Sequence, residues 1–573
     1  MNTSTRVLVV LLVLACAAGC ANIPESTPPR FVTELPQVAS RVVDNPSPGL
    51  NPYGLVGEFV TKTGSSDAAR AYLTPEADAV WSGTSDRVII EDKPKTLPQS
   101  VPEGDRVNEQ VVILTGRQIG RLDPRQAFFA SVQPVEFQFK VARQADGQWR
   151  ISEAPDFALI TESAFVASYR RVNLVFFDPG EKVLVPDLRF MAAEPRDNLE
   201  RRVVELLLKG PSDGLKGAVV SPLDGVVLRT NVVTDSDGAI KINFASVEKT
   251  TEERGKMAVQ VVTTLSEVTT SPIRLLSDDR ALVATKQDWR ASDITPYENL
   301  TTSKPDLLGL AVTGGRLVSL RDGKPIDGPA GSGAYDVVTA AQSLDGSALA
   351  VVQRTGSGVR LRVGKVDGDL PEVGLSQTAT LTRPTWLLSP GEGIAPNEVW
   401  TVQDGTVVTR VVRTVEGTWV GFPVDATELT RDGPITQLRL SRDGVRVAAV
   451  VNGQVRVASV VRANDAVAIR SPLTLQAGVV KQVVGLDWLD RQTLIAVTEQ
   501  PSLPVASLPI DGFSLTQFNS ANLTLPVTAV TAAPSRSTLV MDSLGLWSTQ
   551  EANKVWLTHQ HGQPPGSIPF YPG

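Results

Sequence analysis

The C-terminal half of the chain contains a turn that recurs at a spacing that few folds allow. Ser343–Gly346 and Ser441–Gly444 both read Ser-x-Asp-Gly, and each precedes a short run rich in valine and alanine. Weaker relatives lie near Trp386, Trp488 and Pro534, so that successive turns are 43 to 55 residues apart. About 40–50 residues make one four-stranded propeller blade, and Gly supplies the positive φ that its turns need.

We therefore expect residues 301–573 to form a β-propeller of about six blades. Five blades have a visible turn, and Leu307–Arg321 adds strands with no turn of their own. The ring would close by pairing the N-terminal with the C-terminal strands of the domain. A pair of β-sandwiches is the alternative for the same strands.

The opening of the chain predicts export. Arg6 is the only charge before Ala21, and Val7–Ala18 is an unbroken apolar run. A positive start, a short apolar segment and small residues at its end are typical of a secretory signal peptide. The run is too short for a membrane-spanning helix, which needs about 20 apolar residues. We assign residues 1–19 to the signal peptide.

Ala17-Ala18-Gly19-Cys20 resembles the lipobox of bacterial lipoproteins. The resemblance implies cleavage between Gly19 and Cys20, with Cys20 becoming an S-diacylglycerol cysteine that also carries an N-acyl group such as palmitate. Both cysteines of the chain, Cys16 and Cys20, lie in this segment. After such cleavage no free thiol or disulfide is left, which suits an exported protein without a disulfide framework. Ordinary secretion is the alternative.

Composition limits the partners of the chain. The 573 residues carry a formal charge of −7 and exceed what one core can hold. The net negative charge and the lack of a Lys/Arg cluster disfavour nucleic acid. Residues 20–50, with six prolines, predict a lipidated, extended tether.

Residues 51–165 predict helices followed by antiparallel strands. Leu55, Val56, Phe59 and Val60 mark one helical face, and alternation over Val135–Ala142 marks a half-buried strand. Further helices are expected around Ala68–Leu73, with an N-cap at Ser65–Asp67, and at Val80-Trp81. Further strands are expected at Arg87–Ile90, Gln110–Thr115 and Gln148–Ser152. This order of elements resembles an NTF2-like α+β cone.

Residues 166–300 carry a more specific pattern. Strands are expected at Val172–Phe177, Val183–Phe190, Val226–Val233, Ile240–Phe244 and from Leu275, with helices at Leu199–Leu208 and Arg254–Leu265. The segments Val175–Phe177, Leu184–Pro186, Leu206–Pro211, Asp237-Gly238 and Gln260–Leu265 resemble the GerMN domain. The resemblance implies an α+β module that binds rather than catalyses.

Three candidate chemistries have a simpler structural explanation. His559 and His561, the only histidines, are spaced to share one side of a strand, but no cysteine and few acids accompany them. Asp235–Gly238 starts like a calcium loop but lacks the glutamate at its twelfth position, where Ser246 stands. Thr250–Glu253 is typical of a helix cap. We expect no catalytic residue, no metal and no cofactor.

The complete arrangement resembles the LpqB lipoproteins of actinobacteria. The resemblance implies a non-enzymatic accessory of the Mtr two-component system, anchored on the outer face of the cell membrane. Its expected partner is the extracytoplasmic domain of the sensor histidine kinase, in cell-envelope homeostasis and division. One alternative is a cell-wall glycan-binding lipoprotein that uses Trp386, Trp400, Trp419 and Trp488 near the propeller mouth. A hydrolase in the propeller or the cone is the other.

Overall fold

The structure is a computed structural model. It describes residues 45–62, 69–81, 87–98, 108–193, 198–297, 303–388, 394–464 and 466–573. These residues belong to one compact unit. The predicted signal peptide, Cys20 and most of the predicted tether lie outside them, as does the predicted N-cap at Ser65–Asp67.

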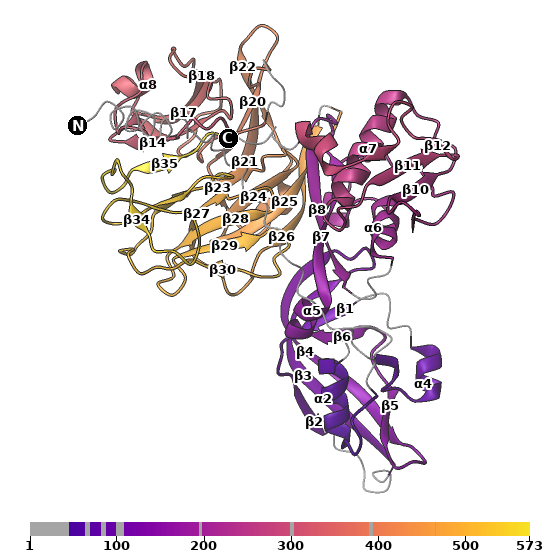
Figure 1. Cartoon of the computed structure of the whole chain (residues 1–573). Helices are drawn as coiled ribbons and strands as arrows, with labels where there is room; N and C mark the ends of the chain where they lie inside the picture. The colour runs from indigo at the N-terminus through magenta and orange to yellow at the C-terminus, as the bar shows by residue number, and fades with distance from the viewer. Residues whose placement is uncertain are drawn as a thin grey trace, which may run out of the picture. The chain divides into compact units, whose positions relative to one another are not determined.

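The first part of the described chain is an α+β domain (Figure 1). Its elements are α2 (Pro52–Lys62), α4 (Pro75–Val80), β1 (Arg87–Ile90), β2 (Lys95–Pro98), β3 (Glu109–Leu122), β4 (Phe128–Arg143), β5 (Trp149–Glu153), β6 (Ala158–Thr161) and α5 (Glu162–Ser168). The sheet runs β5-β4-β3-β1-β6, with β2 paired to β3, and β6 is parallel to β1. Helix α2 contacts this sheet, and Phe59, Tyr72, Trp81 and Phe139 fill the core between them.

The sequence predicted β1 and α2 closely and missed β2, β6 and α5. Strand β2 is exposed and has little apolar alternation, whereas all four residues of β6 are buried. Neither strand therefore shows the period of a half-buried strand.

Thr74 accepts a hydrogen bond from the Ala77 amide and caps α4, as expected for Thr before Pro at a helix start. Ser47, in the segment assigned to the tether, already donates to Glu58 of α2. The NTF2-like assignment of this domain stays a prediction.

The second part is an α+β domain with two sheets. Its elements are β7 (Tyr169–Phe177), β8 (Leu184–Ala192), α6 (Leu199–Leu208), a 3₁₀ turn (Asp213–Leu215), β9 (Val233–Thr234), β10 (Ile240–Phe244), α7 (Thr251–Leu265), β11 (Ile273–Ser277), β12 (Arg280–Ala281), β13 (Asp288–Trp289) and a 3₁₀ segment (Ala291–Tyr297). Strands β7 and β8 form an antiparallel ribbon. Strands β10 and β11 are parallel, and α7 connects them as a crossover.

The predicted capping pattern of α7 is confirmed. Thr250 Oγ1 accepts from the Glu253 amide, and the Glu253 carboxylate accepts from the Thr250 amide. The predicted strand Val226–Val233 is wrong for most of its length, because only Val233 belongs to β9. Residues 226–232 have no strand and form one isolated bridge, from Leu228 to Phe244, followed by a bend.

The third part consists of six sheets. Their strands are β14 (Leu310–Thr313), β15 (Arg316–Ser319), β16 (Val337–Gln342), β17 (Ala348–Thr355), β18 (Gly358–Lys365), β19 (Thr385–Trp386), β20 (Glu398–Gln403), β21 (Val407–Arg413), β22 (Trp419–Pro423), β23 (Ile435–Leu440), β24 (Arg446–Val451), β25 (Gln454–Ala463), β26 (Ala466–Thr474), β27 (Val483–Trp488), β28 (Thr493–Thr498), β29 (Val505–Pro509), β30 (Thr516–Gln517), β31 (Ala529–Thr531), β32 (Thr538–Met541), β33 (Leu546–Thr549), β34 (Leu557–Thr558) and β35 (Ile568–Phe570). Two single helical turns, α8 (Pro329–Ser332) and α9 (Thr427–Thr430), join strands of this part.

The six sheets close on themselves. One strand from each sheet contacts its neighbours in the ring β35, β16, β19, β23, β27, β31 and again β35. The C-terminal strand β35 pairs with β14, so the first sheet contains both ends of the domain, as the closure prediction required. The ring of first strands is the inner wall of a β-propeller.

The recurring turns have the structure that their spacing predicted. Ser343 Oγ donates to Asp345 at 2.5 Å and accepts from the Ala348 amide, and Gly346 has a φ of +79°. Ser441, Asp443 and Arg446 repeat these contacts, and Gly444 has a φ of +74°. Each turn joins the first strand of a sheet to the second. The serine hydroxyl therefore stabilises the turn between the first and second strands at equivalent positions in two blades.

Candidate functional site

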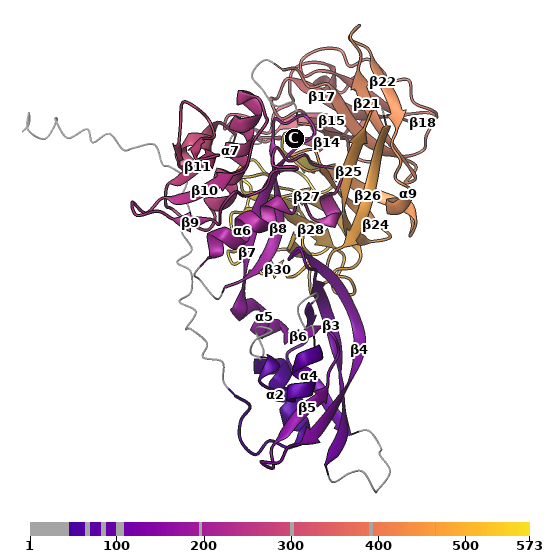
Figure 2. The same cartoon turned by 90° about the vertical axis from the view of Figure 1, so that its right-hand side faces the viewer.

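Side chains from all three parts of the chain meet at one junction. The strand β7 supplies Arg171, whose Nη2 lies 3.1 Å from Asp511 Oδ2 in the propeller. From the same strand, Asn173 Oδ1 accepts a hydrogen bond from Gln492 Nε2. In the opposite direction, Arg446 Nη2 donates to the carbonyl of Pro186 in β8 at 2.5 Å. The β7–β8 ribbon is thus held to the propeller along both of its strands (Figure 2).

An aromatic cluster forms the apolar half of this junction. Phe128 of β4, Phe165 of α5, Phe190 of β8 and Phe513 of the propeller are all buried. The ring centroid of Phe513 lies 5.1 Å from those of Phe128 and Phe165, and 5.5 Å from that of Phe190. Such edge-to-face pairs each contribute about 0.5–1.5 kcal/mol beyond the burial of their area. The junction is therefore a continuation of the domain cores.

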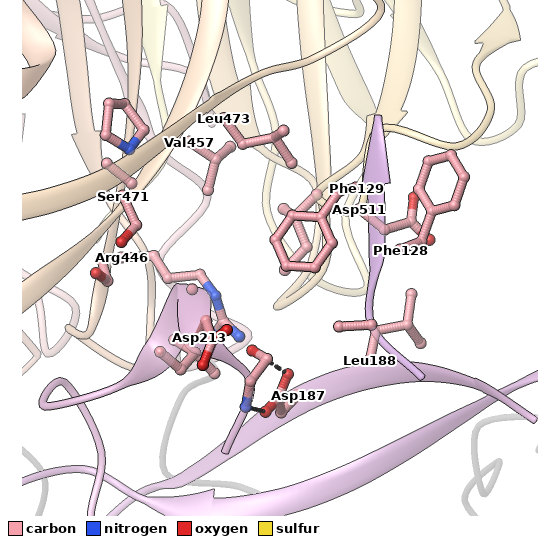
Figure 3. A pocket seen from close by; sticks show the side chains of 18 residues that line it. Phe128, Phe129, Asp187, Leu188, Asp213, Arg446, Val457, Ser471, Leu473 and Asp511 are labelled. Atoms are coloured by element: carbon pink, nitrogen blue, oxygen red, sulfur yellow. Dashed lines mark hydrogen bonds between the residues drawn. The ribbon is translucent and has the colours of Figure 1, made fainter. Parts of the chain in front are cut away.

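A cavity of about 300 Å³ opens beside this cluster. Figure 3 shows Phe128, Phe129, Leu188, Val457 and Leu473 around it, with Arg446, Asp187, Asp213, Ser471 and Asp511 as polar groups. The propeller, the β7–β8 ribbon and the β4 strand all contribute to its wall. A mostly apolar wall with a few fixed polar groups is the usual composition of a binding pocket.

The acids of the cavity already have partners. Asp187 pairs with Arg189 at 2.5 Å and also accepts from the amide and the hydroxyl of Ser212. Arg189 is fully buried. Asp213 lies 3.5 Å from Arg125. A carboxylate that is held by an arginine is a poor general base, so these acids favour binding over acid–base catalysis.

Asp511 is a cavity acid whose pKa is shifted by its surroundings. Burial raises the pKa of its carboxyl above the ordinary 3.8, and the charge of Arg171 opposes part of that shift. Its Oδ1 also accepts from the amide of Phe513, which ties the carboxylate to the aromatic cluster. The segment Asp511–Phe513 therefore joins the ion pair with Arg171 to the aromatic cluster.

The residues that the sequence singled out lie away from this cavity. His559 and His561 contact each other through a turn after β34, where His559 Nδ1 lies 3.3 Å from the His561 carbonyl. They do not share the side of a strand, which corrects that expectation. Asp235 and Asp237 form the predicted hairpin turn, and Arg274 pairs with both at 3.0 and 2.7 Å. No metal-binding group of three or more His, Cys, Asp or Glu occurs among the described residues.

The tryptophans proposed for glycan binding are structural. Trp386, Trp400 and Trp488 expose 3%, 0% and 2% of their surface. The indole of Trp386 donates to the Ala341 carbonyl, and that of Trp488 donates to the Arg439 carbonyl. Each of these two bonds joins the first strands of neighbouring blades. Trp419 is half-buried and packs edge-to-face on Trp386. Their burial contradicts the expectation that these tryptophans bind a glycan near the propeller mouth.

Sequence reasoning missed the junction. Arg171 and Arg446 resemble ordinary outward positions on strands, and their junction partners Asp511 and Pro186 lie far away in the sequence. The one available signal was the charged pair Asp187 and Arg189 within a strand that is otherwise apolar. Opposite charges two residues apart on a buried strand indicate an ion pair that another part of the chain shields from water.

No helix in the described part of the chain is both long and apolar enough to span a membrane. The fold defines a class: a mainly β protein with a C-terminal propeller and two α+β domains in front of it. Three family matches follow the same order. Residues 45–166 match the family "Lipoprotein LpqB, N-terminal domain", residues 173–283 match "Sporulation and spore germination", and residues 315–572 match "Lipoprotein LpqB beta-propeller domain".

Full-length relatives agree with these matches. A protein of Nocardia farcinica named Lipoprotein LpqB is 32% identical, and the alignment covers 100% of this chain and 98% of that protein. The Lipoprotein LpqB of Rhodococcus jostii is 30% identical over 92% of this chain and 90% of its own length. The one of Mycobacterium tuberculosis is 26% identical over 100% of both. The chain therefore belongs to the LpqB lipoprotein family.

Proposed function

We propose that this lipoprotein is a non-enzymatic accessory of a membrane sensor histidine kinase, of the Mtr type, in cell-envelope homeostasis and division. It is anchored on the outer face of the cell membrane through acylated Cys20. There it binds the extracytoplasmic domain of the kinase. The observation that carries the proposal is the junction cavity, with its apolar wall and its acids already paired to arginines. Family membership and the lipobox resemblance support the anchoring.

The junction cavity suits a protein partner for a physical reason. Phe129, Leu188 and Leu473 are half-buried cavity residues, so an apolar side chain that enters would remove more of their surface from water. Burial of apolar surface contributes about 25 cal/mol per Å². Arg446 and Asp187 are held by bonds of their own, so they would orient an entering group without losing those partners.

Site-specific crosslinking in cells tests this proposal. A photoreactive amino acid at Ser471, an exposed residue of the cavity, should capture the kinase ectodomain. The same amino acid at Val415, on the exposed β21–β22 turn, is the matched control and should not. Mass spectrometry identifies the captured protein. Equal capture from both positions, or none at Ser471 in a correctly localised protein, would contradict the proposal.

The anchor has its own test. Cys20→Ala should leave the folded domains intact and release the protein from the membrane fraction. Fractionation of cells with an antibody against the propeller measures it. Normal membrane retention of the variant would show that Cys20 is not the site of acylation. Impaired signalling by a released but folded variant would support a partner that is itself in the membrane.

A further inference from the structure

A cluster of arginines lies in the inner wall of the propeller, apart from the junction cavity. Arg383 precedes β19, Arg439 belongs to β23, and Arg442 follows β23 in the Ser441–Gly444 turn. Arg383 and Arg439 expose only 7% and 4% of their surface. The strands β19 and β23 are neighbours in the inner ring. The charges of Arg383 and Arg439 are therefore held where water has little access, and the half-buried Arg442 interacts with the charge of Arg383.

One carboxylate faces these three charges. Asp487 of β27 lies 3.5 Å from Arg383 Nη1. Among the described residues, Asp487 is also the one acid whose charge raises the pKa of each of these three arginines. Its Oδ2 accepts in addition from Thr531 Oγ1 at 2.8 Å and from the Ala532 amide at 3.3 Å. Asp487 thus balances at most one of the three positive charges.

The guanidinium groups are also short of hydrogen-bond acceptors. Arg439 Nη1 donates to two backbone carbonyls, and Arg442 Nη2 donates to the Pro572 carbonyl at 3.2 Å. The buried Nε atoms of all three arginines, and Nη1 of Arg442, have no partner among the described residues. Buried polar groups are nearly always hydrogen-bonded, and buried charges are nearly always paired. Two of these atoms belong to Arg442, so one acceptor bound beside Arg442 would satisfy both.

The electrostatic cost shows in the titration of the same groups. Burial lowers the pKa of Arg442 to about 10, with Asp487 opposing the shift and the charges of Arg536 and Arg383 contributing to it. Burial and the neighbouring Arg383 hold the pKa of Arg439 well below its ordinary range. A negative charge bound in the cluster would relieve both effects.

A small cavity beside Arg442 limits the size of the missing acceptor. It has a volume of about 20 Å³ and is lined by Leu344, Trp386, Leu387, Leu388, Leu440, Ser441, Arg442 and Gly573. About 10–15 Å³ of such space holds one water-sized particle. A phosphate or a carboxylate group needs more room than this. The apolar walls offer few donors besides Arg442.

We propose that the small cavity beside Arg442, in the inner wall of the propeller, binds a single halide-sized anion. Chloride is the probe and has the required charge and size. The bound anion supplies an acceptor for Nε and Nη1 of Arg442, and its negative charge offsets the positive charge of the cluster that Asp487 leaves unbalanced. This site is independent of the proposed function, because none of its residues lines the junction cavity.

Thermal unfolding of the full-length protein in detergent tests the site. Because the anion binds only the folded state, each tenfold increase of chloride above its Kd should raise the melting temperature of the propeller by about 2–4 °C. Total ionic strength is kept constant with gluconate, which is too large for the cavity. The Arg442→Gln variant should lose this dependence. Arg354→Gln, which removes an exposed arginine of the same domain, should keep it.

A second, direct measurement uses the wild-type protein and so does not depend on whether the Arg442→Gln variant folds. Crystals of the wild-type protein grown in bromide should show one anomalous peak within hydrogen-bonding distance of Arg442. A melting temperature that does not depend on chloride, the same dependence in gluconate, or an unchanged dependence in Arg442→Gln would each overturn the proposal. So would bromide crystals without a peak at Arg442.

Discussion

Two buried arginine sites of this protein differ in how their charge is balanced. Arg189, in the β7–β8 ribbon, is fully buried and pairs with Asp187, which Ser212 holds in turn. Arg383 and Arg439, in the propeller wall, are almost as buried but share one acid between them. The first site is complete within the chain, whereas the second needs a group from outside. Burial alone therefore does not say whether an arginine is structural or able to bind.

The largest effect is expected where the balanced site is broken. Asp187→Ala leaves Arg189 buried without its carboxylate, and removing one partner of a buried pair costs about 3–5 kcal/mol. Hydrogen exchange of the β8 peptide, followed by mass spectrometry, measures the loss of local stability. Protection that falls by less than about 1 kcal/mol would mean that the Arg125 carbonyl suffices to hold Arg189.

A smaller effect, dependent on the anion, is expected at the unbalanced site. Asp487→Asn keeps a side chain that can contact Thr531 but removes the one negative charge, which should cost about 1–3 kcal/mol at low chloride. The variant should bind chloride more tightly, so its melting temperature should begin to rise at a lower chloride concentration than that of the wild type. An unchanged onset would indicate that Asp487 and the anion do not share these arginines.

At the junction, the comparison can be tested through the pH dependence of stability, with an effect of intermediate size. Because burial raises the pKa of Asp511, its contribution to stability is present below the ordinary pKa of 3.8 and is lost as pH rises through the folded-state pKa. Asp511→Asn, which is neutral at every pH, should compare better with the wild type at pH 7 than at pH 4, so that any gain in its stability shrinks on acidification. Melting temperatures at the two pH values measure it. A gain that grows on acidification would contradict the direction of the shift.

The smallest effect is expected at an exposed pair in the same domain as Arg189. Arg201 and Glu205 lie one helical turn apart on α6, with an Nε to Oε1 distance of 3.6 Å and both side chains more than a third exposed. Such a pair contributes about 0.2–0.5 kcal/mol. Glu205→Gln should therefore leave the exchange of the α6 peptide almost unchanged. A loss as large as that of Asp187→Ala would remove the contrast between buried and exposed arginines.

Local patterns of the sequence determined much of this protein. The helix Leu199–Leu208, the capping box at Thr250 and the glycine turns at Gly346 and Gly444 agree with their predictions. These features depend on neighbours within a few residues, so the chain specifies them without its tertiary structure. The spacing of the turns also predicted a propeller, because each blade repeats the same local unit.

Only the tertiary structure decided what the buried polar and aromatic side chains do. Trp386 and Trp488 resembled ligand-binding aromatics, but each indole joins two inner strands that are about fifty residues apart. Arg171 meets Asp511, and Arg383 meets Asp487, across still longer separations. Neither hydrophobic period nor turn chemistry carries information about such partners. A charge on a strand looks the same in the sequence whether it faces water or a buried carboxylate.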